Sequence, residues 1–203
     1  MNLAYLLGSG DDTPHFTMKL NILGMDNCFE AARITGVNRV TYASSIAVSG
    51  QQSNFGDRTI NEDDPMHGTS QYAMHKRFNE FQAQQFNSVY GMSITGIRPA
   101  NVTGPDKVRG STDHVQCVTL PAAGESVSFP KAGLMRLPVH VDDIACATFH
   151  LMHLASEGKR PKIVNVADNL PSTNIEVMRY AALLIKTTLP PIESFEKAVR
   201  TMS

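Results

Sequence analysis

Residues 37–45 read VNRVTYASS, and this stretch decides the fold, because it reads as a buried strand that ends in two serines. Its β-branched and aromatic residues favour a strand. A helical pattern from Pro14 to Thr35 precedes it, and another at 72–90 separates it from a second apolar strand, MSITGIR, at 92–98. Strands that alternate with helices predict a parallel sheet. We therefore expect an α/β protein with its chemistry at the carboxyl ends of the strands.

The remaining segments extend this pattern in both directions. The opening residues LAYLL, 3–7, read as the end of a buried strand, and the polar residues 46–71 read as a long loop. In the helix at 72–90, three phenylalanines are expected to face a core, namely Phe78, Phe81 and Phe86. Further helices are expected at 112–123, from Asp142 or Asp143 to Leu154, and at 173–185, and further strands at 126–129, 134–141 and 162–168.

Composition excludes several classes of protein. The chain has 203 residues, 42% of them hydrophobic, with 18 basic and 19 acidic side chains. A net charge of −1 gives no basic excess for nucleic acid. The cysteines, Cys28, Cys117 and Cys146, are far apart, which argues against a disulfide framework and favours a reducing, cytoplasmic location. No apolar run is long enough for a membrane span, and the start lacks the basic region of a signal peptide.

A tyrosine and a lysine four residues apart are the strongest chemical signal. Tyr72 and Lys76 would project from one face of a helix, and a nearby cation lowers the pKa of a phenol. Such a tyrosine can exchange a proton with a substrate hydroxyl or carbonyl. Ser44 and Ser45, at the end of the preceding strand, could orient the same oxygen. A solvated helix face is the simpler alternative for the Tyr–Lys pair alone.

Other candidate sites are weaker. His150 and His153 stand three apart on a helix, but no third ligand is placed near them, so no metal is expected. The sequence lacks a GxSxG motif, and Pro130 argues against a helical SxxK site at 128–131. Hydrolysis without a cofactor, by an activated Tyr–Ser pair, remains an alternative.

Taken in order, the motifs resemble the extended short-chain dehydrogenase/reductase family, the NAD-dependent epimerases/dehydratases. LAYLL is similar to a strand end that usually reads His-Leu-Ala, and the helix at Asn21 to that family's Asn-Val-x-Gly. The other matching motifs are YASSIAVSG at 42–50, the Tyr72–Lys76 pair, RPANVTGP at 98–105 and HVDDIA at 140–145.

The resemblance implies a role for each matched position. Tyr72 would be the general acid and base, Lys76 would lower its pKa and bind the nicotinamide ribose, and Ser45 would hold the substrate oxygen. Asn21 would support proton relay. The positions that would line the cofactor, NAD or NADP, are Leu3, Ala4, Ala43, Ser44, Tyr72, Lys76, Pro99 and Val102. Asn101 and Arg136 would contact a small-molecule substrate, such as a sugar or nucleotide sugar.

The chain departs from the family at its amino end. It contains no GxxGxxG, the motif with which such proteins bind pyrophosphate, and the only candidate, Gly8-Ser-Gly10, is followed by two aspartates. We interpret residues 1–111 as a truncated Rossmann-like domain that carries the site, and 112–203 as a mixed substrate-binding part. About 70 residues, three strands of the fold, would be absent.

This interpretation has two consequences. The first remaining strand would have an exposed edge, which predicts association into a homo-oligomer or a rearrangement of the first residues that covers the edge. A chain without the phosphate loop could also be a catalytically impaired remnant that acts as a binding or assembly module. His75, Ser49 and Thr103 replace residues usual in the motifs, which affects substrate contacts more than mechanism.

Overall fold

A computed structural model of the chain describes residues 1–6, 13–127, 137–154, 161–167 and 171–185. The chain divides into two compact units, and each is considered by itself. The first comprises residues 1–100 and 142–166, and the second comprises 101–141 and 167–203. The first unit therefore receives a helix and a strand from late in the sequence.

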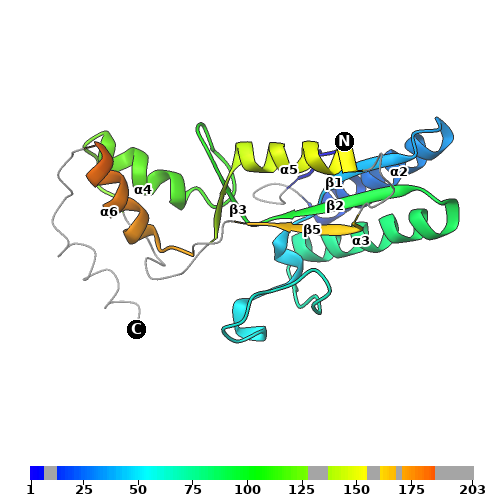
Figure 1. The fold of residues 1–203 in the computed structure, drawn as a ribbon, viewed down its shortest axis with the longest axis horizontal. Helices are drawn as coiled ribbons and strands as arrows, with labels where there is room; N and C mark the ends of the chain where they lie inside the picture. Colours follow the sequence, from blue (N-terminus) through cyan, green and yellow to red (C-terminus); the bar gives the residue numbers. More distant parts are fainter. Residues whose placement is uncertain (7–12, 128–136, 155–160, 168–170, 186–203) are drawn as a thin grey trace. The chain divides into compact units, whose positions relative to one another are not determined.

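A parallel three-stranded sheet forms the centre of the first unit. Its strands are β1 (Arg39–Ala43), β2 (Ser93–Pro99) and β5 (Ile163–Val166), in the order β1-β2-β5. The helices α3 (Gln71–Tyr90) and α5 (Val141–Leu154) lie on opposite sides of these strands (Figure 1). The predicted α/β class with parallel strands is confirmed.

The first helical segment is continuous but changes its geometry. It consists of α1 (Pro14–Met18), a π-helical turn η1 (Lys19–Leu23) and α2 (Gly24–Ile34). The Thr13 side chain accepts a hydrogen bond from the Phe16 N–H, and proline at the first helical position suits the helix start. The helix predicted from Pro14 to Thr35 is confirmed, whereas the π-helical turn was not predicted. Such turns occur frequently at functional sites, and this one contains Asn21.

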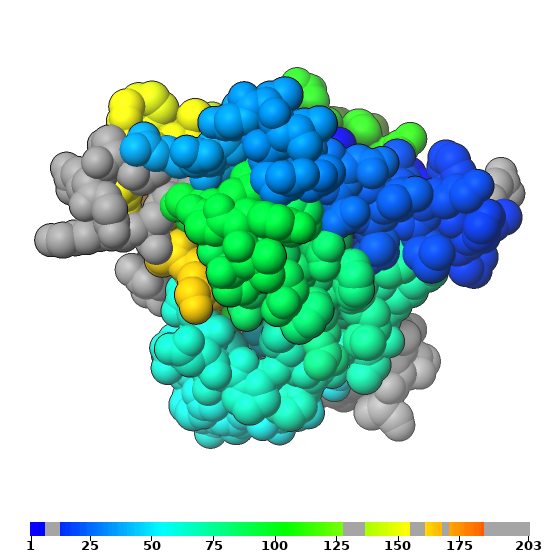
Figure 2. Space-filling model, turned by 90° about the vertical axis from the view of Figure 1, so that its right-hand side faces the viewer, coloured from blue at the N-terminus to red at the C-terminus, as the bar shows by residue number. Residues whose placement is uncertain are grey.

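The helix α3 packs against β2 and α2, and its aromatic residues divide between core and surface. Phe86 is buried in a cluster with Phe29 and Tyr42, whose rings meet edge to face. Phe78 and Phe81 are 44% and 56% exposed, so the prediction that they face a core is wrong. The inward positions of α3 carry polar and small side chains instead, which are Ala73, Lys76, Asn79, Glu80 and Ala83. Figure 2 shows the surface formed by the blue α2 segment and the green-blue α3 segment.

The first six residues do not form the predicted strand. Asn2 alone makes a parallel bridge, by donating from its N–H to the Thr41 carbonyl and accepting from the Ala43 N–H. Leu3 is 52% exposed, so the expected buried strand at 3–7 is wrong for its described part. The ladder ends there because the Ala4 N–H donates to the Asn2 side chain and the Ala43 carbonyl accepts from Lys76, so the next bond of the ladder is not made.

The long segment after β1 is a loop, as predicted, with two 3₁₀ turns, η2 (Ile46–Val48) and η3 (Gln52–Asn54). Its far end returns to its start, because the N–H of Gly68 donates to the Val48 carbonyl at 2.9 Å. A side chain at Gly68 would come within 2.2 Å of the Ala47 carbonyl oxygen, so this close approach requires glycine.

The second unit contains a two-stranded parallel sheet, β3 (Asn101–Thr103) with β4 (Pro138–His140), and the helices α4 (Asp113–Ala122) and α6 (Asn174–Ile185). The two helices pack around buried Cys117 and Met178. The helices predicted at 112–123 and 173–185 are confirmed.

Some late predictions are wrong, and others are tested only in part. The strand expected at 126–129 is not formed in its described part, 126–127, and 128–129 lie outside the described residues. In α5 the first turn already contains Asp142 and Asp143, so neither is its cap. The strand expected at 134–141 is β4 alone among the described residues, and 128–136 lie outside them. No helix in the parts that the structure describes is long and apolar enough to cross a membrane.

The aromatic cluster gives a direct test of this packing. Phe29→Ala removes a side chain with no exposed surface, so we expect a loss of about 3–5 kcal/mol in the free energy of unfolding, measured with urea. Ile34→Ala, on the same helix but exposed, is the control and should change the stability by less than about 0.5 kcal/mol. Equal losses in the two variants would contradict the described core.

Candidate active site

Lys76 lies beneath the end of β1 with its ammonium group inside the protein. The residue is 1% exposed, and its Nζ donates a hydrogen bond to the Ala43 carbonyl at 2.6 Å. Tyr72 lies one turn earlier on α3, as the spacing predicted, and the Lys76 Nζ is 5.7 Å from the centre of its ring. The first turns of α3 are thus joined to the carboxyl end of a parallel strand.

Ser45 is brought to Tyr72 by the loop that follows β1. Its side chain accepts from the Ala47 N–H, which starts the η2 turn, and it lies close enough to the Tyr72 phenol to act on the pKa of that group. The backbone bond between Val48 and Gly68 holds this turn beside the start of α3. Ser45, Tyr72 and Lys76 therefore lie together, although 26 residues separate the serine from the tyrosine in the sequence.

Burial dominates the protonation of both ionisable groups. It lowers the pKa of Lys76 to about 7, while the charge of Glu80 acts in the opposite direction. Burial also raises the pKa of Tyr72, and the Ser45 side chain offsets only part of this effect. The sequence-based expectation that Lys76 lowers the tyrosine pKa is therefore wrong for this arrangement. Tyr72 is therefore a neutral phenol at neutral pH.

The Tyr5 ring lies against the Lys76 ammonium group. The Lys76 Nζ lies 3.4 Å from the centre of the Tyr5 ring, which is the geometry of a cation–π contact. The same ring meets Tyr72 edge to face, with 5.2 Å between centres. The ammonium group is therefore enclosed between a carbonyl oxygen and an aromatic face.

Asn21 fixes the amino-terminal segment rather than contacting Tyr72. Its carboxamide both accepts from the Leu6 N–H at 2.9 Å and donates to the Leu6 carbonyl at 2.8 Å. Its own backbone carbonyl accepts from Asn79, and its Nδ2 is 3.4 Å from Nδ1 of His75. A cavity of about 210 Å³ opens here, lined by Leu6, Thr17, Asn21, Ser70, Gln71, Tyr72 and His75.

A buried ion pair supports the serine-bearing end of β1. Glu80 receives two hydrogen bonds from Arg98, at 2.8 and 2.7 Å, and a third from the Ser44 hydroxyl. Glu80 and Arg98 are both 3% exposed. Arg98 also donates to the carbonyl of Glu62 in the long loop. One carboxylate thus connects α3, β2 and the residue before Ser45.

The other residues expected at a cofactor or substrate site are distributed over both units. Ala43 uses its carbonyl on Lys76, Ser44 is turned toward Glu80, and Pro99 ends β2 in the first unit. Leu3 and Ala4, also in the first unit, are exposed. Asn101 and Val102 belong to β3 in the second unit, and Arg136 lies outside the described residues.

Sequence reasoning missed Tyr5 and Glu80. Glu80 follows Lys76 by four residues, so the same spacing rule that selected Tyr72 and Lys76 would have placed it on their face of the helix. Tyr5 gave no such signal, because within LAYLL it looks like one more apolar core residue.

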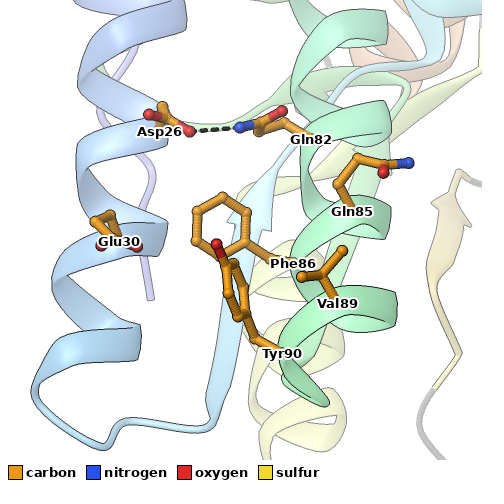
Figure 3. Close-up of a pocket in the computed structure, with 7 residues that line it drawn as sticks. All are labelled: Asp26, Glu30, Gln82, Gln85, Phe86, Val89 and Tyr90. Carbon is orange, nitrogen blue, oxygen red and sulfur yellow. Dashed lines mark hydrogen bonds between the residues drawn. The ribbon is translucent and has the colours of Figure 1, made fainter.

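A second cavity lies between α2 and α3, away from Tyr72. It has a volume of about 340 Å³ and is lined by Asp26, Glu30, Gln82, Gln85, Phe86, Val89 and Tyr90 (Figure 3). Gln82 donates to Asp26 across it at 2.6 Å. No group of three or more His, Cys, Asp or Glu suited to a metal ion occurs among the residues with a described placement.

A parallel α/β unit with a serine, tyrosine and lysine at one strand end defines a protein of the short-chain dehydrogenase type. A family model described as the NAD dependent epimerase/dehydratase family matches residues 2–167. The chain belongs to this family.

Individual relatives agree with this assignment. The UDP-glucose 4-epimerase of Mycolicibacterium smegmatis is 34% identical over 95 residues, which are 46% of this chain and 29% of that protein. A UDP-N-acetylglucosamine 4-epimerase from Methanobrevibacter ruminantium matches 93% of this chain and 62% of its own, with a TM-score of 0.74 and 21% identity. A dTDP-glucose 4,6-dehydratase from Bacillus anthracis, in complex with NAD, matches 88% of this chain and 56% of its own, with a TM-score of 0.73 and 20% identity. At such identities the structures show the fold alone, and the matches span less than two thirds of each relative.

The depressed pKa of Lys76 predicts a pH dependence of stability. The unfolded chain binds the lysine proton up to a pKa near 10.5, whereas the folded chain releases it near 7. Between these values the unfolded state holds more protons, so the free energy of unfolding should rise with pH. In urea unfolding between pH 7 and 10, we expect the free energy of unfolding of the native chain to rise more steeply with pH than that of Lys76→Met. Lys19→Met, at an exposed position, should follow the native curve, and parallel curves for Lys76→Met would contradict the burial of a titrating amine.

The Glu80–Arg98 pair gives a second stability test. Arg98→Met leaves a buried carboxylate without its cation, and we expect a loss of about 3–5 kcal/mol. The double variant Glu80→Leu/Arg98→Met should recover part of it, because no charge is then buried alone. Arg58→Met breaks the exposed pair with Asp64 and should cost at most about 1 kcal/mol. If Arg98→Met costs no more than this control, the buried pair does not support the site.

Proposed function

We propose that the chain is an NAD(P)-dependent oxidoreductase or isomerase of the epimerase/dehydratase type, which acts on a sugar, nucleotide sugar or other small hydroxyl or carbonyl compound. The meeting of Ser45, Tyr72 and Lys76 at the carboxyl end of β1 is the observation that carries this proposal. The Tyr72 phenol donates its proton to a substrate carbonyl oxygen or, in the reverse direction, takes one from a hydroxyl. Ser45 orients that oxygen through its own hydroxyl, and Asn21 fixes the segment beside Tyr72.

The functional groups of Tyr72 and Lys76 on α3 are of the types that can bind a nicotinamide ribose. An ammonium and a phenol on one helix face are suitable partners for the two ribose hydroxyls, and Ala43 fixes the ammonium in place. When bound, the nicotinamide supplies the hydride that the amino acids cannot. The obstacle is Tyr5, because its ring occupies the space directly over the Lys76 Nζ.

A nucleotide sugar is the substrate class that the relatives favour, since the Mycolicibacterium protein is described as a UDP-glucose 4-epimerase. In this proposal residues 1–111 form the later part of a Rossmann-like domain, and 112–203 hold the substrate with Asn101 and Arg136. Leu3, Ala4, Ser44, Pro99 and Val102 would line the cofactor. A cytoplasmic location also remains a prediction.

A catalytically impaired binding or assembly module is the second candidate. One observation favours it, namely the position of the Tyr5 ring over the Lys76 ammonium group. In this case the chain would associate through the sheet edge beside β1, where Asn2 makes a single parallel bridge to Tyr42 among the described residues.

Calorimetric titration with NAD and NADP distinguishes these candidates. The enzyme proposal predicts saturable binding of one of the two, because hydride transfer needs a positioned cofactor. No heat of binding at millimolar concentration, for a chain shown to be folded by its thermal unfolding, would contradict the enzyme proposal and favour the module.

Tyr72→Phe tests the proton transfer itself. With the cofactor that binds and UDP-glucose as the first substrate assayed, we expect kcat to fall by about 10²–10⁴-fold, while cofactor affinity stays near that of the native chain. Tyr90→Phe, at the other end of α3 and exposed, is the matched control and should keep full activity. Retained turnover in Tyr72→Phe would exclude this residue as the acid and base.

Light scattering tests the association through the sheet edge. We expect a homo-oligomer, and Asn2→Pro should strengthen its association, because it removes the N–H that bonds to the Thr41 carbonyl within the chain and so uncovers more of the β1 edge. A native chain that is monomeric at all concentrations measured would contradict association through this edge.

A further inference from the structure

We propose that Tyr5 is a gate over Lys76, and that a ligand hydroxyl reaches the lysine only after the Tyr5 ring has swung away. This inference rests on the proposed function, because it concerns the same lysine. It adds a residue that matches none of the motifs and that controls access to the site rather than taking part in proton transfer.

The contacts of the Lys76 ammonium group carry the argument. Of its three N–H donors, one is used by the Ala43 carbonyl at 2.6 Å. The Tyr5 ring covers the group at 3.4 Å, and the residue as a whole is 1% exposed. A hydroxyl oxygen that accepts from Nζ needs to lie about 2.7–3.2 Å from it. The Tyr5 ring stands where such an oxygen would approach.

The attachments of Tyr5 are suited to movement of its side chain. The backbone is held on both sides, by the bridge of Asn2 to β1 and by the clamp of Asn21 on Leu6. The ring itself is held by its packing on the Lys76 ammonium group and on the Tyr72 ring rather than by a short hydrogen bond. Its hydroxyl is 3.4 Å from the Tyr72 carbonyl oxygen, at the limit of a hydrogen bond. Rotation about the side-chain bonds can therefore expose Lys76 without breaking either backbone anchor.

A ligand that replaces the ring must satisfy the ammonium group that the ring leaves. Vicinal hydroxyls, as in ribose or another sugar, offer oxygen acceptors to the freed N–H donors, and a hydrogen bond to an ammonium group is strong. The Tyr5 gate thus favours polyhydroxylated ligands over apolar ones, and it keeps the lysine covered in their absence.

Chemical labelling of Lys76 tests the gate without any assay of turnover. The full chain is treated with acetic anhydride from pH 6 to 10, and acetylation of each lysine is followed by mass spectrometry. The limiting rate reports accessibility, whereas the midpoint of the pH profile reports the pKa. We expect Tyr5→Ala to raise the limiting rate at Lys76 by about tenfold or more, because labelling no longer waits for local opening. Tyr5→Phe keeps the ring and should label within about twofold of the native rate.

Lys19, which is exposed, serves as the internal control and should label equally in all three proteins. Equal limiting rates at Lys76 in the native chain, Tyr5→Ala and Tyr5→Phe would overturn the gate. Tyr5→Leu, which keeps an apolar side chain of intermediate size, should give an intermediate rate, and a native-like rate for it would also overturn an aromatic gate.

Titration of the same proteins with NAD and NADP separates this inference from the proposed function. Tighter binding of NAD or NADP by Tyr5→Ala than by Tyr5→Phe supports both the gate and the enzyme proposal. Faster labelling of Tyr5→Ala with no cofactor binding in any variant upholds the gate and contradicts the enzyme proposal. Cofactor binding with equal affinity in all variants, together with equal labelling, contradicts the gate and leaves the enzyme proposal standing.

Discussion

The hydrogen bond from the Lys76 ammonium to the Ala43 carbonyl is the contact on which the arrangement of the site depends. It joins the second turn of α3 to the last residue of β1, and so fixes the helix that carries Tyr72 against the strand that delivers Ser45. The cost of this contact is an ammonium group removed from water, which the lowered pKa of Lys76 records. A carbonyl oxygen, an aromatic ring and the charge of Glu80 together reduce that cost.

A second buried charge extends the same connection across the sheet. Glu80 lies one turn after Lys76 on α3 and binds Arg98 of β2 and the hydroxyl of Ser44. Arg98 continues to the Glu62 carbonyl, and the Glu62 side chain accepts from the Asn165 N–H on β5. The loop between Ser45 and Tyr72 is thereby held at the carboxyl ends of β2 and β5. Hydrogen-bonded charges of this kind are suited to positioning rather than to net stability.

The sequence predicted the alternation of helices with parallel strands and the proximity of Tyr72 to Lys76, and failed where tertiary contacts override the local pattern. Tyr72 and Lys76 were found from their spacing, and Ser45 from its place at a strand end, because both are local rules. The pKa of Tyr72 was predicted in the wrong direction, since burial is not visible in a sequence. Leu3 was expected to be buried, but the Ala4 N–H bonds to the Asn2 side chain and the Ala43 carbonyl to Lys76, so the strand does not continue past Asn2. The role of Tyr5 was not predictable, because its partner Lys76 lies 71 residues further along the chain.

An NMR titration of the Lys76 side chain, assigned by comparison with Lys76→Arg, tests this account most directly. The ε-carbon of a lysine changes its chemical shift when the neighbouring amine releases its proton. The account predicts a titration midpoint near pH 7 for Lys76, well separated from the other lysines, because its ammonium is enclosed by Ala43 and Tyr5. A midpoint near 10.5, the value of a lysine in water, would contradict the buried ammonium on which the described site depends.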